Sequence, residues 1–367
     1  MDCCEIVLSE IAQFKNGKKR VNFEGDIPVY GGNGIMGYST EFNNQNCVII
    51  GRVGAYCGNV YYESKKCWVS DNAISAVPVK NHDVTFLYYL LKSLRLNERS
   101  IGSSQPLITQ KILNGIKCHV PSLQKEKVIA KILHNLDVKI KLNAQINDNL
   151  EQQAQAYFQE LFVDNADPAW FLGSVSDLGA VVGGSTPSKS KPEYYTEDGI
   201  AWITPKDLSI NKAKFISHGE NDITELGLKN SSASIMPKGT VLFSSRAPIG
   251  YIAIASGDVT TNQGFKSVVP KPEIGTPFVY YFLKQNLSII EGMASGSTFK
   301  EISGSTMKKV PVIIPDTETL TLFSNFCNAI FSQQRLLEEQ NQSLAIMRDC
   351  LLPKLMSGEL DVSNISV

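Results

Sequence analysis

The two halves of this chain resemble each other, and this internal similarity constrains the fold more than any single motif does. The segment "VIIGRVGAYCGNV" aligns with "VLFSSRAPIGYIAI", which places Arg52 against Arg246 at an offset of 194. Further on, "FLYYLLK" (86–92) aligns with "FVYYFLK" (278–284) at an offset of 192. Before the arginines, the second half carries 27 more residues than the first. The sequence therefore predicts two copies of one globular unit that share a frame and differ in their loops.

Each copy is followed by a long segment with apolar residues at alternating steps of four and three, which is the spacing of a heptad seam. The first segment predicts a helix over 124–162, about 58 Å long at 1.5 Å per residue. Polar residues interrupt the seams, Asn143 and Asn147 in the first and Gln333 and Gln340 in the second. Since each helix needs a partner, we expect the two to pack on each other in the same chain; the alternative is two ordinary core helices. The apolar seam residues are Ile129, Leu133, Leu136, Ile140, Leu150, Tyr157, Phe323, Ile330, Leu337, Leu344 and Leu351.

The composition fits a soluble globular protein with two domains, because the chain has 367 residues, of which 43% are hydrophobic and 19% charged. No apolar run approaches membrane-spanning length, and the first residues, "MDCCEIVLSEIAQF", carry acids where a leader would carry bases. We therefore expect a cytoplasmic protein. The eight cysteines form no C-x-x-C pair and the chain has only four histidines, so we expect neither a zinc site nor a disulfide framework.

The formal net charge of −1 is unevenly distributed along the chain. Residues 1–121 hold 13 Lys and Arg against 10 Asp and Glu, and residues 166–315 hold 14 against 13. The acidic excess lies in 122–165 and 316–367. Any basic surface therefore belongs to the two globular copies, and this modest asymmetry fits an ordinary protein about as well as a DNA-binding one.

The stretch "IPVYGGNGIMGY" contains Gly32, Gly34 and Gly37 in the pattern G-x-G-x-x-G. A dinucleotide site of this kind requires a helix directly after the glycines, since the phosphates lie at its N-terminus. Here a polar turn and then a β-branched run follow, "YSTEFNNQNCVIIGRVG". We expect a hairpin-type loop in which glycine supplies positive φ, with a nucleotide-binding enzyme as the alternative.

Two further stretches carry a resemblance to a known family. These are "GGSTPSKSKPEYYTEDGIAWITPKDLS" (183–209), which opens the second globular copy, and "LLPKLMSGEL" (351–360), which closes the chain. With the doubled "FLYYLLK" and "FVYYFLK", the chain resembles the specificity subunit of a Type I restriction-modification system over nearly its whole length. The resemblance implies an α+β fold: two related mixed α/β target recognition domains, bridged by two long antiparallel helices as a coiled-coil spacer, with an internal pseudo-two-fold repeat. It implies these boundaries: recognition domain 1 at 1–121, a central spacer helix at 122–165, recognition domain 2 at 166–315, and a C-terminal spacer helix and tail at 316–367.

The resemblance also implies a function and a set of partners. In that family each recognition domain reads one half of a split site in double-stranded DNA, and the helices dock two methyltransferase subunits, with restriction subunits completing the complex. S-adenosylmethionine, ATP and magnesium are expected on those partners and no cofactor on this chain, which we expect to be non-catalytic by itself. This fits the sequence, which has no Asn-Pro-Pro-Tyr, Walker or H-x-x-x-H motif. The chain departs from the family in its shorter first domain, where "IPVYGGNGIMGY" stands at the place of "IAWITPKDL".

Side-chain chemistry and the repeat suggest which residues contact DNA. Arg52 and Arg246 could bind guanine or phosphate, or form a structural ion pair. The amides of Asn72, Asn262 and Gln263 could pair with adenine or cap turns. The full set of candidates is Arg52, Asn72, Ser103, Ser104, Gln105, Thr204, Lys206, Arg246, Asn262, Gln263, Ser297 and Thr298, with no catalytic residue and no metal ligand.

The serine-rich turns offer hydroxyl groups for phosphate, with capping of the next helix as the alternative. The tyrosine pairs Tyr88–Tyr89 and Tyr280–Tyr281 lie in apolar helical runs, and we expect them in the core. A structural coiled-coil adaptor is a competing class of protein, but it would not explain two copies of a loop-rich unit.

Overall fold

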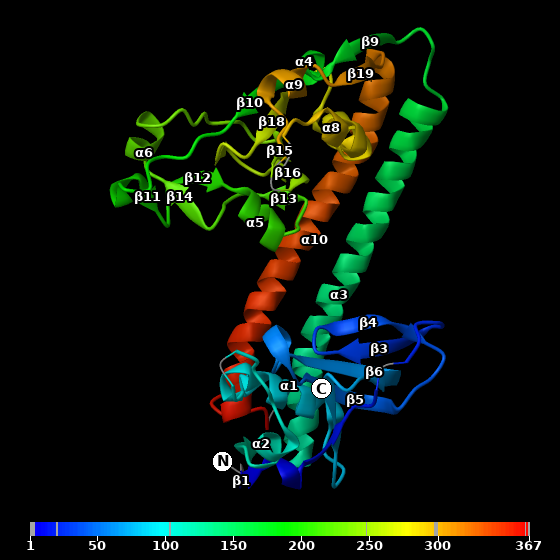
Figure 1. Ribbon diagram of the computed structural model, residues 1–367, viewed down its shortest axis with the longest axis vertical. Helices are drawn as coiled ribbons and strands as arrows, with labels where there is room; N and C mark the ends of the chain where they lie inside the picture. The colour runs from blue at the N-terminus through cyan, green and yellow to red at the C-terminus, as the bar shows by residue number, and fades with distance from the viewer. Residues whose placement is uncertain are drawn as a thin grey trace. The chain divides into compact units, whose positions relative to one another are not determined.

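The computed structural model describes residues 4–19, 21–102, 104–246, 248–296, 300–363 and 365. It divides into two compact units, the first comprising Met1–Leu142 with Asn341–Val367 and the second Asn143–Gln340. Two long helices contribute residues to both units: α3 (Leu123–Gln159), followed by a π-helical turn at Glu160–Asp164, and α10 (Thr317–Ser357). The helix expected over 124–162 is therefore present (Figure 1).

The globular part of the first unit is built on one six-stranded sheet. Helices α1 (Val84–Ser93) and α2 (Gln110–Asn114) accompany the sheet, and 3-10 turns lie at Leu8–Glu10, Gly54–Tyr56 and Leu96–Arg99. A separate ribbon pairs β1 (Cys4–Val7) with β8 (Lys117–Val120). The sheet order is β2 (Ala12–Asn16), β7 (Ala73–Pro78), β5 (Asn44–Gly51), β6 (Val60–Val69), β3 (Ile27–Gly31) and β4 (Gly34–Ser39).

The globular part of the second unit has more elements. A ribbon pairs β19 (Pro311–Ile314) with β9 (Phe171–Ser174). The larger sheet has the order β10 (Gly179–Gly183), β18 (Lys266–Pro270), β15 (Val241–Ser245), β16 (Ile249–Ala255) and β13 (Phe215–Ile216). The smaller sheet has the order β11 (Tyr195–Thr196), β14 (Asn221–Ile223), β12 (Ile200–Ile203) and β17 (Thr260–Thr261). The helices are α4 (Val175–Leu178), α5 (Pro205–Ile210), α6 (Glu225–Lys229), α7 (Thr276–Gln285), α8 (Leu287–Met293) and α9 (Gly304–Lys308), with a 3-10 turn at Pro192–Tyr194.

The pairing of strands repeats residue by residue between the two copies, which confirms the internal repeat. Three strand pairs of the first copy recur in the second, at an offset of 167 residues before the first loops and of 192 to 194 after them. The matched pairs are Ile6 with Cys118 and Gly173 with Val312; Phe14 with Ala76 and Val181 with Val268; Val48 with Tyr62 and Val241 with Ile254.

Backbone hydrogen bonds show that Arg52 and Arg246 do not occupy equivalent positions of the two copies. The carbonyl of Arg52 accepts from Ile108 N, and in the second copy the carbonyl that accepts from Ile302 N belongs to Ser245, not to Arg246. Arg246 instead forms an isolated bridge with Glu301, as Val53 does with Leu107. By strand register, Arg52 therefore corresponds to Ser245 and Val53 to Arg246. The alignment that matches the two arginines is wrong by one residue, because it follows side-chain identity and not backbone pairing.

The glycine-rich stretch forms a β-hairpin and not a nucleotide-binding turn. Strand β3 turns directly into β4, so strand, and not a helix, follows the first glycines. Gly34 has φ of 84°, which is the positive φ expected of glycine in this loop. The end of β3 corresponds to the end of β12, because Ser70 N donates to Tyr30 O in the first copy and Asn262 N donates to Ile203 O in the second. After β12 the second copy forms α5 in place of the hairpin.

The two long helices pack antiparallel within each unit, since rising numbers on α3 meet falling numbers on α10. In the second unit, Asn147 Nδ2 donates to Gln334 O and Tyr157 contacts Phe323. In the first unit, Arg348 donates to Asp137, 2.8 Å away. The eleven apolar seam residues named above are buried or half-buried, but Phe326 and Met347, which the same steps of four and three include in the second seam, are exposed.

One polar position of the predicted seam is wrong. Gln333 is exposed, and its neighbour Gln334 is 3% exposed in its place. An α-helix has 3.6 residues per turn, so strict steps of four and three drift around a straight helix. Asn143 and Gln340 do meet, with Nδ2 and Oε1 3.4 Å apart.

Each copy places its tyrosine-bearing helix in its own core, as expected. In α1, Tyr89 is 1% exposed and Tyr88 is half-buried; in α7, both Tyr280 and Tyr281 are buried. Asp83 caps α1 by accepting from Phe86 N, 2.8 Å away, which satisfies a free backbone donor of its first turn. Each helix also contacts α3, because Tyr89 donates to Asp137 and Tyr281 donates to Glu151.

Candidate DNA interface

Within each copy, two loops come together at equivalent places of the fold, and five of the candidate residues lie on these loops: Asn72, Thr204, Lys206, Asn262 and Gln263. In the second copy, a Cβ on Gly264 would come 3.0 Å from Pro205 Cγ, so the 262–264 turn lies against the start of α5. In the first copy, a Cβ on Gly32 would come 3.6 Å from the carbonyl oxygens of Asn72 and Val53. The structure thus brings the turn after β3 to the 70–72 turn, and the turn after β12 to the 262–264 turn.

Thr204 begins α5 and is engaged in holding it. Its backbone N and its Oγ1 both donate to Asp207 Oδ2, each at 2.7 Å, while Asp207 Oδ1 accepts from Glu220 N at 2.8 Å. This is a capping box, which satisfies free backbone donors of the first helical turn. The hydroxyl of Thr204 therefore stabilises the start of α5. Lys206, two residues later, is exposed and carries the positive charge of this loop.

Lys206 is exposed and pairs with Glu220, with Nζ and Oε2 2.5 Å apart. The hydrogen bond and the negative charge of Glu220 raise the pKa of Lys206 above its ordinary value. An exposed pair of this kind contributes little to stability, so the lysine is free to exchange its carboxylate for another anion such as a phosphate.

Arg246 forms the structural ion pair that was one of its two expected roles. Its guanidinium lies 3.5 Å from Glu301 Oε2, and Lys266 Nζ lies 3.9 Å from Oε1 of the same carboxylate. Burial lowers the pKa of Lys266, against the effect of Glu301. Two cations share one anion, so the site keeps an excess of positive charge beside the loops.

The amides of the second copy also contribute to turn structure. Asn262 Oδ1 accepts from Gly264 N at 2.8 Å, which is the turn-capping role considered for it. Gln263 Oε1 accepts from the hydroxyl of Thr186, in the loop after β10. This bond joins the 183–191 segment to the 262–264 turn.

In the first copy, Arg52 lies beside Asn72, whose carbonyl accepts from Arg52 N at 2.9 Å. Arg52 Nε is buried, and none of the described residues accepts a hydrogen bond from it. Asn72 is exposed, as are Ser104 and Gln105. Thr109 caps α2 by accepting from Ile112 N, so Ser104 and Gln105 do not cap the next helix. Ser103, Ser297 and Thr298 lie outside the described residues.

Sequence reasoning missed the partners that hold these loops. Glu301 and Lys266 beside Arg246 come from distant segments, and Lys214, in the polar stretch "NKAKF", becomes buried only through tertiary contacts. Nothing in the sequence pattern distinguishes Lys214 from the exposed Lys212, two residues earlier. Within the described ranges, no three His, Cys, Asp or Glu side chains gather as they would around a metal ion. Nor is any described helix both long and apolar enough to cross a membrane.

Comparison with known proteins agrees with this architecture. The chain matches the family described as Type I restriction modification DNA specificity domain over residues 3–152 and again over 169–344. The Type I restriction enzyme MjaIX specificity subunit of Methanocaldococcus jannaschii is 44% identical over 163 residues, which are 44% of this chain and 38% of that protein. The HindI specificity subunit of Haemophilus influenzae is 26% identical over 357 residues, 75% of this chain and 77% of that protein.

A solved structure has the same fold. The crystal structure of a Type-I restriction-modification system S subunit from M. genitalium aligns with a TM-score of 0.67 at 17% identity, covering 97% of this chain and 96% of that one. Two copies of a mixed α/β domain, each matched by the same family, define a duplicated DNA specificity protein. The chain belongs to the Type I restriction-modification DNA specificity family.

Proposed function

We propose that this chain is the DNA-reading subunit of a Type I restriction-modification complex and that each copy reads one half of a split site. The observation that carries the proposal is the repeated strand register, since a duplicated frame with different loops presents two different reading surfaces in the same way. The proposed boundaries are 1–121 and 166–315 for the two recognition domains, with 122–165 and 316–367 as the spacer helices.

The candidates divide by the contact they can make. Lys206 and the cationic group around Arg246 are suited to phosphate, which fixes orientation on the duplex without reading sequence. Asn72 and Gln263 carry amides suited to base edges in the major groove. Arg52, with its buried Nε, serves the loop that carries Asn72.

Catalysis in the proposed complex belongs to partner subunits. Two methyltransferase subunits would bring S-adenosylmethionine and modify adenine, and restriction subunits would bring ATP and magnesium for cleavage. The chain itself would be non-catalytic and cytoplasmic, and it would hold these subunits as well as the DNA. Its net charge of −1 supports this division of labour, because a nearly neutral chain needs partners to neutralise phosphate.

The test is a genome-wide map of methylated adenines in cells that express the chain with its own partner subunits. We expect one motif with two specified parts separated by a fixed number of unspecified bases. A continuous motif, or the absence of methylation that depends on this chain, would contradict the proposal. The purified chain alone should bind the same motif only weakly at physiological salt.

A further inference from the structure

Lys214 is the most deeply buried lysine in the second copy, and it lies among the residues that make this copy longer than the first. It sits between α5 and β13, and 7% of its side chain is exposed. Burying an ammonium group is costly unless it is paired and hydrogen-bonded. The partners of Lys214 therefore indicate what the segment is built to hold.

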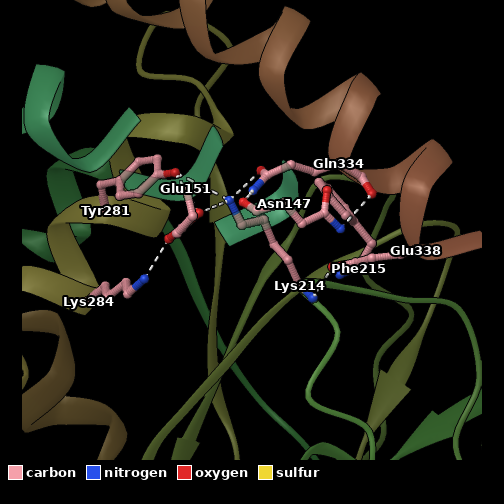
Figure 2. A network of polar contacts seen from close by, with 8 residues as sticks. All are labelled: Asn147, Glu151, Lys214, Phe215, Tyr281, Lys284, Gln334 and Glu338. Carbon is pink, nitrogen blue, oxygen red and sulfur yellow. Dashed lines mark hydrogen bonds and ion pairs between the residues drawn. The ribbon is translucent and has the colours of Figure 1, made fainter. Parts of the chain in front are cut away.

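One amine contacts three helices of the second unit (Figure 2). Lys214 Nζ donates to Glu151 of α3, to Gln334 Oε1 of α10 at 2.6 Å, and to the hydroxyl of Tyr281 of α7 at 3.2 Å. Gln334 also donates to the carbonyl of Asn147 on α3 at 3.1 Å. The segment that carries Lys214 is thereby fixed to both long helices at one point.

The backbone of the same segment is held by a second carboxylate. Glu338 of α10 accepts from Lys214 N at 2.9 Å through Oε1 and from Phe215 N at 3.2 Å through Oε2. Two successive backbone donors on one carboxylate fix the direction of the chain as well as its position. Figure 2 shows Glu338 beside Phe215 and Lys214.

The electrostatics of the network favour the charged form of Glu151, whereas burial lowers the pKa of Lys214 against the opposing effect of Glu151. Burial raises the pKa of Glu151, but the ammonium groups of Lys214 and Lys284 outweigh it and hold the value at about 2. Lys284 Nζ lies 2.5 Å from Glu151 Oε1. A buried ion pair often adds little net stability compared with apolar packing, and its best-attested use is to specify one arrangement.

At its N-terminal end, the segment that carries Lys214 follows directly after α5, the helix that bears Lys206. Asn211 N donates to the carbonyl of Asp207 at the end of α5, 2.8 Å away, and Asn211 Oδ1 accepts from Ala213 N at 3.0 Å. Seven residues separate Lys214 from the exposed Lys206 of α5. The contacts form a continuous connection from the long helices to the loop that presents Lys206.

We propose that Lys214 and Glu338 are positioning residues that fix the orientation of the second recognition domain on the two long helices and so limit the gap allowed between the half-sites. The inference rests on the proposed function and adds a specificity role for residues that touch no DNA. Without the network, the domain keeps its reading surface but occupies a wider range of orientations. Half-site bases then stay the same while sites with a gap one base pair longer or shorter become acceptable.

The test compares Lys214→Met with Lys212→Met in the complete complex. Methionine retains most of the apolar stem of lysine, and Glu151 keeps Lys284 and Tyr281 as partners. Lys212 is exposed, so its variant removes the same charge from the same segment without opening the network. The measurement is the rate of methylation on DNA with the parental gap and with gaps one base pair shorter and longer.

We expect Lys214→Met to lower the preference for the parental gap by about tenfold with unchanged half-sites, because small misplacements of bound groups have large effects on rate. Lys212→Met should keep the parental preference. An unchanged preference in Lys214→Met, or altered half-site bases, would overturn the proposal.

Glu338→Gln carries the test if Lys214→Met does not fold, since glutamine keeps the shape and one acceptor oxygen. Hydrogen exchange at the backbone amides of Lys214 and Phe215 tests the network without any DNA. Exchange should be faster in Glu338→Gln than in the parent. Equal protection in variant and parent would show that Glu338 does not hold this segment. A parental motif without a gap would instead overturn the proposed function and the gap-limiting role with it, while the exchange result would still stand.

Discussion

The two copies attach to the long helices through the same tyrosine but through different charged partners. In the first unit, Tyr89 of α1 donates to Asp137 of α3 at 2.5 Å, and Arg348 of α10 donates to the other oxygen of Asp137. In the second unit, Tyr281 of α7 donates to Glu151 of α3 at 2.9 Å, and the cations are Lys214 and Lys284, both from the globular domain itself. The repeated frame therefore fixes where a copy attaches, while the charged group that completes the attachment can come from a helix or from a loop.

A second pair of equivalent positions shows the same freedom. In the first copy, Glu126 is buried and accepts from His82 Nδ1 at 2.6 Å and from Asp83 N at 3.1 Å. The matching positions in the second copy are Ile274 and Leu320, which pack in its core. The same position in the fold therefore holds a hydrogen-bonded polar pair in the first copy and an apolar pair in the second. Both are stable, because the buried carboxylate has its hydrogen-bond donors and the apolar side chains pack in a hydrophobic core.

The largest expected effect comes from exchanging residues 166–315 for the corresponding domain of a related subunit. If the copies read independently, one half of the methylated motif should change completely and the other half should stay. Methylation should be more efficient when the donor domain carries a lysine at the position of Lys214, because Glu151 and Glu338 remain on the helices of this chain. Adenine methylation mapping measures both outcomes. Changes in both halves would show that the copies do not read separately.

Removing the acceptor of the second attachment should cause the largest loss of stability from a single substitution. Glu151→Leu leaves Lys214 buried without its carboxylate, and breaking a buried pair in this way typically costs about 3–5 kcal/mol. The loss should be confined to the second unit, since Glu151 and its partners all lie there. Hydrogen exchange resolved along the chain checks this, with the amides of α1 as the internal control. Equal loss of protection in α1 and α7 would refute independent attachment.

The paired substitutions Tyr89→Phe and Tyr281→Phe compare the two attachments directly. Each removes a hydrogen bond to a carboxylate, for an expected cost of about 1.5–3 kcal/mol. Tyr281→Phe should cost more, because the hydroxyl of Tyr281 also accepts from Lys214 at 3.2 Å. Protection of α1 and α7 in the two variants provides the measurement. A larger effect at Tyr89 would mean that the first attachment, in which Tyr89 and Arg348 share Asp137, is stronger than the second, in which Tyr281 and Lys214 share Glu151.

The sequence could predict the frame because the frame repeats. Two copies of "F-x-Y-Y" with the same apolar neighbours identify α1 and α7, and steps of four and three identify α3 and α10. The glycine hairpin was also predictable, because a β-branched run follows it where a helix would be needed. The side-chain partners were not predictable, since Lys214 and Lys212 have the same local sequence character and differ only in what packs against them. For the same reason the arginines could be misaligned by one residue, which only the hydrogen bonds of Ser245 and Arg52 correct.

The smallest effect on folding and the most specific effect on DNA are expected at Lys206, where the copies differ most. The first copy has the Gly31–Gly34 turn at this place, and the second has α5 with an exposed lysine paired to Glu220. Lys206→Met should leave the unfolding of the second unit unchanged within error, because exposed ion pairs contribute little. If Lys206 contacts phosphate, the variant complex should bind all sequences more weakly and the dependence of log affinity on log salt should decrease by about one unit. If it reads a base, the salt dependence should stay and the second half-site should relax at one position. Binding measured at several salt concentrations on matched and singly altered sites separates the two roles, and an unchanged affinity in every case would remove Lys206 from the interface.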